Sequence, residues 1–111
     1  MLKDKDRFDI KLIDFDLVRD IKSSSSGTIQ ESPDINGSNV YYDSPEIIHG
    51  TYNEKCDIWA IGILLYYMVS GTIPFDGLYT EEIRKTILLG SFDLDSDIWF
   101  FVSEDAKDLI R

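Results

Sequence analysis

Asp14 is the side chain in this sequence best placed for metal chemistry. Residues 8–15 alternate apolar and polar side chains, which predicts a short strand that delivers Asp14 to its end. A carboxylate at a strand end can bind a hard divalent cation, and phosphoryl transfer from a nucleotide needs such a positioned cation. A carboxylate there is also an ordinary solvated turn residue, so Asp14 alone does not decide between the two.

The stretch from residue 20 to residue 39 has no apolar period. It contains four consecutive serines (residues 23–26) together with Gly27, Pro33 and Gly37, a composition that predicts a mobile loop. Loops of this length inside a compact domain are uncommon and usually functional. A linker between domains is the alternative, but we expect too little chain before it to form a domain.

The rest of the chain is predicted to be helical. We expect a short helix from residue 45 to Gly50, a long one over 53–70, a third over 80–90 and a fourth from residue 103 onward, from the capping residues and glycines at their ends. The long helix is apolar at residues 58–69 except for Gly62, which predicts that it is buried on all sides. The fold class is therefore mainly α with a short N-terminal β-strand region.

Composition and charge narrow the classes of partner. The 111 residues carry 21 acidic and 11 basic side chains and a net charge of −10, which repels phosphate backbones and argues against nucleic-acid binding. The charge suits cationic partners such as basic peptides, and it also fits ordinary solubilising surface charge.

Two further features concern the compartment. Cys56 is the only cysteine, which fits a reducing compartment and predicts a cytoplasmic protein. Residues 58–75 carry no charge, but Gly71 and Pro74 interrupt them, so we expect no membrane span.

Three motifs are far more specific together than alone. Asp14-Phe15-Asp16, Ser44-Pro45-Glu46 and Asp57-Ile58-Trp59-Ala60-Ile61-Gly62, in this order and spacing, resemble the C-terminal half of a eukaryotic protein kinase domain. Residues 44–48, 52–59, 70–75 and 102–110 are similar to the calcium/calmodulin-dependent and calcium-dependent branch of the serine/threonine kinases.

The resemblance covers essentially the whole chain and implies its organisation. Residues 1–111 are expected to form a partial kinase domain, from its C-terminal lobe. The strand and metal-binding motif lie at 8–16, the activation segment at 14–46 and a helical subdomain at 47–111.

The resemblance also assigns roles to residues around the nucleotide and the substrate. Asp14 corresponds to the magnesium ligand, and Phe15 to the aromatic that packs inward and sets the position of the aspartate; both belong to the ATP and Mg²⁺ site. Asn39, Tyr41 and Tyr42 fall in the segment that positions the substrate.

Structural roles are implied for Ser44, Pro45, Glu46, Asp57, Trp59 and Gly62. Glu46 corresponds to a glutamate that pairs with an arginine beyond Arg111, and Asp57 to an aspartate that anchors the catalytic loop. Trp59 is expected to pack against the Pro-Glu turn, and Gly62 to let another element approach closely.

Arg19 lies where kinases often place a basic side chain that faces a phosphate on the activation loop. The candidate acceptors are Thr28, Ser32 and Ser38, so the resemblance implies regulation by phosphorylation of this loop.

The sequence departs from the kinase pattern at three positions. Asp16 stands where glycine is usual, and we expect a stiffer backbone switch there because aspartate reaches left-handed conformations only at a cost. Asn39 replaces a threonine, which bears on acceptor specificity, and Ser44 replaces an alanine.

Two functions stay open. The first is a piece of an active serine/threonine kinase, which acts on protein substrates and has a calcium-sensor regulatory region outside this chain. The catalytic loop is then expected upstream of Met1, no catalytic residue lies within the chain, and residues 1–111 alone are predicted to be inactive. The second is a non-catalytic kinase remnant that acts as a protein-binding module.

Overall fold

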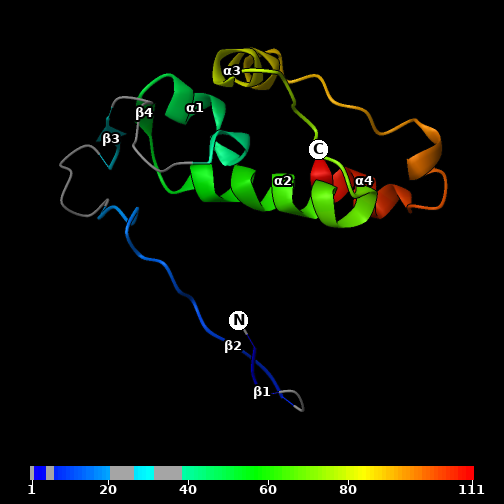
Figure 1. Ribbon diagram of the computed structural model, residues 1–111, viewed down its shortest axis with the longest axis horizontal. Helices are drawn as coiled ribbons and strands as arrows, with labels where there is room; N and C mark the ends of the chain where they lie inside the picture. Colours follow the sequence, from blue (N-terminus) through cyan, green and yellow to red (C-terminus); the bar gives the residue numbers. More distant parts are fainter. Residues whose placement is uncertain (1, 5–6, 21–26, 32–38) are drawn as a thin grey trace.

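The computed structural model describes residues 2–4, 7–20, 27–31 and 39–111 (Figure 1). In chain order the elements are β1 (Leu2–Asp4), β2 (Arg7–Ile10), β3 (Ile29–Gln30), the 3₁₀ helix η2 (Val40–Tyr42), α1 (Pro45–Ile48), β4 (Thr51–Tyr52), α2 (Lys55–Ser70), α3 (Thr80–Leu89), the 3₁₀ helix η3 (Asp97–Trp99) and α4 (Glu104–Ile110). The mainly helical fold with a short N-terminal strand region is confirmed.

The N-terminal strands form an antiparallel hairpin that is followed by an extended arm. β1 pairs with β2 from Leu2 opposite Ile10 to Asp4 opposite Arg7. The expected strand over residues 8–15 is therefore shorter than predicted, since β2 ends at Ile10. Residues 11–20 are all exposed, and they lead from the hairpin towards the helices (Figure 1). We call residues 11–20 the arm.

A second two-stranded sheet lies within the stretch that the sequence predicts to be a loop. Ile29 pairs with Tyr52 and Gln30 with Thr51, and the Glu31 N–H donates to the Gly50 carbonyl at 3.1 Å. The prediction of a loop without secondary structure is therefore wrong at β3, because a distant segment satisfies its backbone groups. Residues 21–26 and 32–38 lie outside the described residues.

The four helices lie close to where the sequence predicts them. The start of α2 differs, because the helix begins at Lys55 rather than residue 53 and its N-cap residue is Glu54, without a side-chain cap. The Ser44 and Ser103 hydroxyls accept the N–H groups of Ile47 and Ala106 at the starts of α1 and α4. Gly71 and Gly90 end α2 and α3 in the left-handed conformation, with φ of 73° and 64°, which glycine adopts without steric cost.

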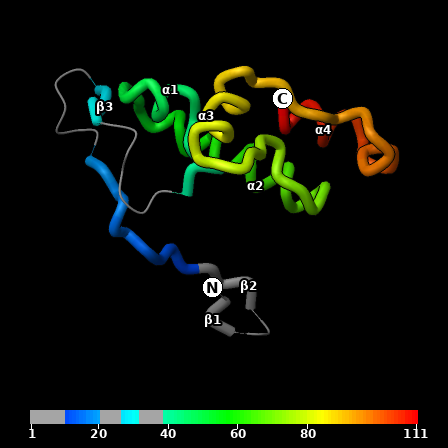
Figure 2. Tube along the Cα trace, turned by 45° about the horizontal axis from the view of Figure 1, so that its top comes forward, coloured from blue at the N-terminus to red at the C-terminus, as the bar shows by residue number. Residues whose placement is uncertain are grey.

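Two groups of buried side chains hold the helices together. The first core cluster consists of Ile63, Phe75, Ile83 and Ile87. The second core cluster consists of Tyr66, Leu94 and Trp99. Because Ile63 and Tyr66 lie three residues apart on α2, one face of this helix serves both clusters. Figure 2 shows α1, α3 and α4 along the same side of α2.

The opposite side of α2 departs from the sequence prediction. Only Ile63 and Tyr66 of this helix are buried, whereas Ile58 and Met68 are 67% and 73% exposed. The prediction of a helix buried all round is therefore wrong for this chain, since α2 packs against other described elements along one face only. No helix among the described residues has the length and apolar character to cross a membrane.

Candidate functional site

Asp14 lies on the arm in an unusual backbone conformation. Its φ is 65°, and within the described residues it is the only non-glycine residue with a positive φ. This conformation is costly for a residue with a Cβ atom, and such strain concentrates at functional sites. The Asp14 side chain is exposed. Within the Asp-Phe-Asp motif the left-handed conformation is therefore adopted by Asp14. Asp16, which stands at the usual glycine position, has a negative φ.

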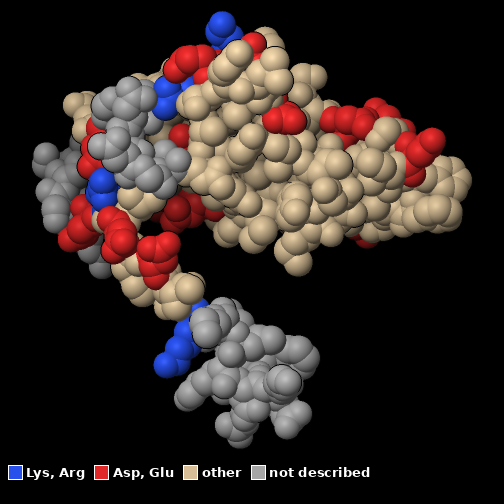
Figure 3. Space-filling model, viewed as in Figure 1, with Lys and Arg blue, Asp and Glu red and all other residues tan. Residues whose placement is uncertain are grey.

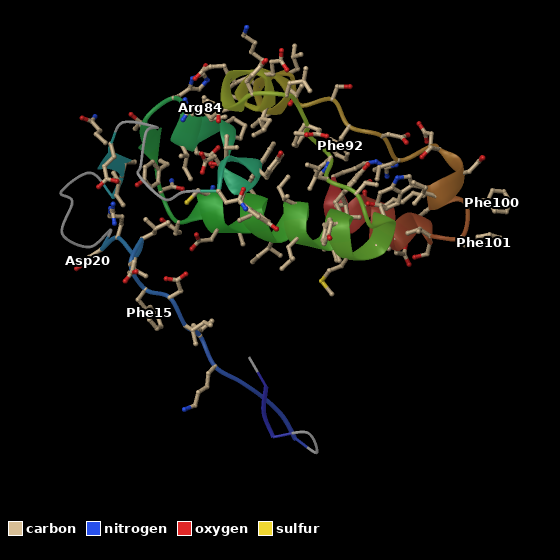
Figure 4. The ribbon with its side chains drawn as sticks, in the orientation of Figure 1. Phe15, Asp20, Arg84, Phe92, Phe100 and Phe101 are labelled. Carbon is tan, nitrogen blue, oxygen red and sulfur yellow. The ribbon has the colours of Figure 1, made fainter. Side chains whose placement is uncertain are left out.

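Phe15 does not pack inward. Its side chain is 62% exposed, and Figure 4 shows it on the arm, away from the helices. The expectation of inward packing is therefore wrong in this structure, because none of the arm's side chains enters either core cluster. The Val18 N–H donates to the Phe15 carbonyl at 3.1 Å, so a tight turn follows the motif.

The acidic and sulfur side chains bear on metal binding. Within the part of the chain that the structure describes, no group of three or more His, Cys, Asp or Glu side chains could hold a metal ion. Magnesium in nucleotide sites is commonly held by one or two carboxylates together with water and phosphate oxygens. A single exposed carboxylate such as Asp14 fits that chemistry, and its role as a metal ligand stays a prediction.

The Ser-Pro-Glu motif forms the start of α1. The Ser44 side chain is fully buried, and its Oγ accepts the Ile47 N–H at 3.4 Å. Pro45 occupies the first turn, where its missing N–H costs nothing. The Glu46 carboxylate also lies in the first turn and complements the helix dipole. Serine in place of the usual alanine thus provides an N-cap.

The predicted substrate-positioning residues lie beside an open cavity. Asn39 precedes η2, and its Oδ1 accepts the Tyr41 N–H at 3.4 Å. Tyr41 and Tyr42 are half-buried against the first core cluster. The cavity has a volume of about 570 Å³. It is lined by Val40, Tyr41, Gly77, Leu78, Tyr79, Thr80, Glu81 and Ile83. Predicted substrate residues and the start of α3 therefore share one concave surface.

Asp43 is a buried acid to which the sequence analysis assigned no role. Its side chain is 6% exposed, and within the described residues its Oδ2 atom has no hydrogen-bond partner. Burial raises the pKa of the Asp43 carboxyl, and the nearby Arg84 guanidinium of α3 opposes this shift. Asp43 therefore brings an unfavourably buried carboxylate to the end of the predicted substrate segment.

The residues expected to anchor the scaffold lie on α2. Asp57 is exposed in the first turn, where its charge suits the helix dipole. The Trp59 ring stacks on Phe75 with centroids 5.6 Å apart, and its packing against the Pro-Glu turn stays a prediction. A Cβ atom at Gly62 would meet nothing within 4 Å. The close approach expected at Gly62 is therefore not made by any described residue.

Glu46, Trp59 and Gly62 contribute to a second, apolar groove of about 520 Å³ between α2 and α4. Lys55 and Arg111 also line this groove. Among the ion pairs found within the described residues, none includes Glu46. Its pairing with an arginine beyond Arg111 stays a prediction.

Arg19 is bound to a carboxylate of the predicted activation segment. Its Nε donates to Glu31 Oε1 at 2.8 Å and to Oε2 at 3.1 Å. The Tyr52 hydroxyl donates to the same Oε2 at 3.1 Å. The hydrogen bond from Arg19 is the main cause of a lowered pKa of the Glu31 carboxyl. The arginine predicted to face a phosphate thus has an anionic partner that needs no phosphorylation.

Of the predicted phosphate acceptors, Thr28 is half-buried beside β3. Ser32 and Ser38 lie outside the described residues. The regulatory role of all three residues stays a prediction.

Sequence reasoning missed Glu31, Tyr52 and Asp43 as parts of this region. No local pattern marks Glu31, because it lies in a stretch without an apolar period. Nothing local marks the other two, because their burial and partners depend on segments far away in the chain.

Comparison with known proteins gives one consistent result. The protein kinase domain family matches residues 1–111. Calcium-dependent protein kinase 25 of Arabidopsis thaliana is 43% identical over 102 residues, which are 92% of this chain and 18% of that protein. Calcium-dependent protein kinase 4 of Plasmodium falciparum (isolate 3D7) is 38% identical over 109 residues, 98% of this chain and 20% of that protein.

A human relative, ribosomal protein S6 kinase alpha-4, is 36% identical over 110 residues, 92% of this chain and 14% of that protein. The chain thus spans a fifth or less of the length of these relatives. The match of the whole chain to the kinase domain agrees with the motifs at Asp14, Ser44-Pro45-Glu46 and Asp57. The chain belongs to the protein kinase family, on the branch of the calcium-dependent serine/threonine kinases.

Proposed function

We propose that the intact protein carrying this chain is a serine/threonine kinase that transfers the γ-phosphate of ATP to hydroxyl groups of other proteins. The observation that carries the proposal is the cavity between the predicted substrate segment and α3. It lies beside Tyr41, so a peptide bound there would run next to the residues assigned to substrate positioning. Its apolar lining and open shape suit an extended peptide better than an enclosed small molecule.

Each assigned residue has a task in this reaction. The Asp14 carboxylate would hold the magnesium ion, which neutralises charge on the phosphates during transfer. Asn39, Tyr41 and Tyr42 would orient the segment that carries the acceptor hydroxyl. The hydroxyl proton would pass to a carboxylate in the catalytic loop, which we expect upstream of Met1. Residues 1–111 alone are therefore proposed to be inactive.

The acidic charge of the chain supports basic protein substrates. A net charge of −10 raises the local concentration of cationic peptides and speeds their encounter. Several relatives are named calcium-dependent protein kinases, which supports a calcium-sensor region outside this chain. A cytoplasmic location is proposed from the single cysteine, whose pKa is raised mainly by burial so that the thiol stays protonated.

The test is phosphate transfer from radiolabelled ATP to a mixture of basic proteins by the intact protein. Asp14→Asn keeps the shape of the side chain and removes its charge, and we expect activity to fall by about 10²–10³-fold. Met68→Gln is the control, because this exposed side chain lies on α2 away from the cavity. Equal activity of the Asp14→Asn variant and the parent would remove Asp14 from the mechanism.

The second candidate, a non-catalytic binding module, is favoured by the exposed apolar face of α2. It predicts no phosphate transfer by the intact protein, with or without magnesium, and unchanged partner binding in the Asp14→Asn variant. The same assay therefore separates the two functions.

A further inference from the structure

Two adjacent phenylalanines lie almost fully in solvent between η3 and α4. Phe100 is 79% exposed and Phe101 is 93% exposed, and their rings meet edge to face with centroids 5.0 Å apart. Figure 4 shows both at the end of the molecule far from the arm. Neither ring lines the cavity beside Tyr41 or the groove between α2 and α4. None of the roles predicted above for residues of this chain involves these two side chains.

The backbone that carries the phenylalanines is firmly anchored. The preceding residue, Trp99, is 1% exposed, and its ring lies 4.8 Å from the Tyr66 ring of α2. The following residue, Val102, packs against the same second core cluster. The Phe100 and Val102 N–H groups donate to the Asp97 and Trp99 carbonyls at 3.2 and 3.1 Å. The two rings are therefore presented from a fixed turn, which reduces the entropy lost on binding.

Carboxylates surround this turn along the chain. Residues 91–106 contain five acidic residues and no Lys or Arg. Figure 3 shows acidic groups and no basic ones over the segment that joins α3 to α4 on that face. Glu104 is bound to Lys107 at 3.0 Å, whereas no ion pair of Asp93, Asp95, Asp97 or Asp105 is found within the described residues. Hydrogen bonds from Ser96 and Asp95 lower the pKa of the Asp93 carboxyl, so it stays ionised.

The negative charge around the turn determines which kind of partner can bind to the aromatic pair. A second copy of the chain would bring the carboxylates of residues 91–106 close to the same carboxylates of the other copy, which would repel it. An anionic membrane would be repelled for the same reason. A cationic segment with apolar anchors satisfies both the rings and the carboxylates. We propose that Phe100 and Phe101, with Asp95, Asp97 and Asp105, form a docking surface for a basic amphipathic helix of a partner protein.

The test measures binding of a fluorescein-labelled peptide of leucine and lysine, arranged as one amphipathic helix, to the intact protein by fluorescence anisotropy. Phe100→Gln with Phe101→Gln is expected to weaken binding by about tenfold or more. Met68→Gln with Leu89→Gln is the matched control, because it removes two largely exposed apolar side chains elsewhere and should leave binding unchanged.

Charge and occupant are tested separately. Asp95→Asn with Asp97→Asn is expected to weaken binding and to flatten its dependence on salt, and it keeps the aromatic pair intact if the phenylalanine variant folds poorly. Equal binding of a peptide with serine in place of leucine would overturn the docking surface, as would unchanged binding by the phenylalanine variant. Self-association that disappears in the phenylalanine variant, measured by sedimentation, would assign the surface to a second copy and overturn the proposed partner. None of these readouts depends on kinase activity.

Discussion

The arm and the helical body (residues 39–111) differ in how far their side chains are buried. Residues 11–20 carry the predicted metal ligand and expose every side chain, whereas residues 39–111 bury two core clusters. Burial of apolar surface stabilises the helical body, while no side chain of the arm belongs to either core cluster. The contacts described for the arm include the Arg19–Glu31 ion pair and the hydrogen bond from the Val18 N–H to the Phe15 carbonyl. The residue with the clearest chemical assignment therefore lies where packing contributes least.

That difference has a physical consequence for the site. Asp14 keeps a strained φ of 65° although its side chain is exposed, and strain of this kind persists only when surroundings support it. Tyr41 and the cavity beside it are instead supported by the first core cluster. The substrate half of the proposed site is thus preformed, and the metal half depends on further contacts.

The largest difference between the two regions is expected when one aromatic side chain is truncated in each. Trp99→Ala removes a fully buried ring from the second core cluster, and we expect it to cost about 3–5 kcal/mol of unfolding free energy. Phe15→Ala removes an exposed ring from the arm and should change stability by less than about 0.5 kcal/mol. Urea unfolding followed by circular dichroism measures both. Similar losses would show that the arm is packed as tightly as the body.

Two serine N-caps test the contrast within the helical body. Ser44→Ala removes the buried cap of α1, and we expect a loss of about 1 kcal/mol. Ser103→Ala removes the exposed cap of α4, where water can replace the hydroxyl, so its effect should be smaller. Thermal unfolding of the two variants compares them directly. The reverse order would mean that Ser44 Oγ contributes little beyond its fit in the core.

The buried Asp43 carboxyl makes the stability of the helical body depend on pH, which can be tested. Burial raises the pKa of the Asp43 carboxyl above its ordinary value of 3.8. The protonated Asp43 carboxyl therefore contributes its full stabilisation of the folded state below about pH 3.8. This stabilisation is lost as the pH rises through the pKa that Asp43 has in the folded protein. Asp43→Asn should stabilise the protein by about 1 kcal/mol at neutral pH, and the difference should vanish in acid. Thermal unfolding across pH measures it. A constant difference would exclude the carboxylate charge as its cause.

The smallest effect is expected where the arm meets β3. The Arg19–Glu31 pair is about one-third exposed on both sides, so its contribution to global stability is small. Because the pKa of the Glu31 carboxyl is lowered, the ionised carboxylate contributes its full stabilisation of the folded state above pH 4.5, the ordinary pKa. This stabilisation is lost as the pH falls through the pKa that Glu31 has in the folded protein.

Glu31→Gln should therefore leave neutral-pH stability nearly unchanged and remove this acid-range dependence. Titration of the Glu31 carboxyl by NMR in the parent, and in an Arg19→Gln variant as control, measures the shift. An ordinary pKa in the parent would show that the Arg19 contact does not persist in solution.

Much of the helical body could be predicted from local signals. Pro45, Gly71, Gly90 and the serine caps mark helix ends through interactions within one turn of chain, and the structure confirms them. The motif spacing predicted the kinase family, which the comparison with known proteins confirms. The roles of Asp14, Asn39 and Asp57 follow from that resemblance and stay predictions.

The remaining features could not be predicted because their partners are distant along the chain. The pairing of Ile29–Gln30 with Thr51–Tyr52 and the capture of Arg19 by Glu31 join segments whose sequences carry no sign of each other. The uniform apolar pattern of α2 gave no indication of which face would find neighbours. The same holds for Phe15, whose exposure contradicts the inward packing expected from the motif.

The sequence alone therefore determined the family, the helix positions and the acidic charge, since these depend on residue types, short-range capping and composition. Only the tertiary structure decided which apolar residues are buried, that Asp43 is desolvated, and that Phe100 and Phe101 remain in solvent. Burial is set by what packs against a residue, and that neighbour is usually many residues away.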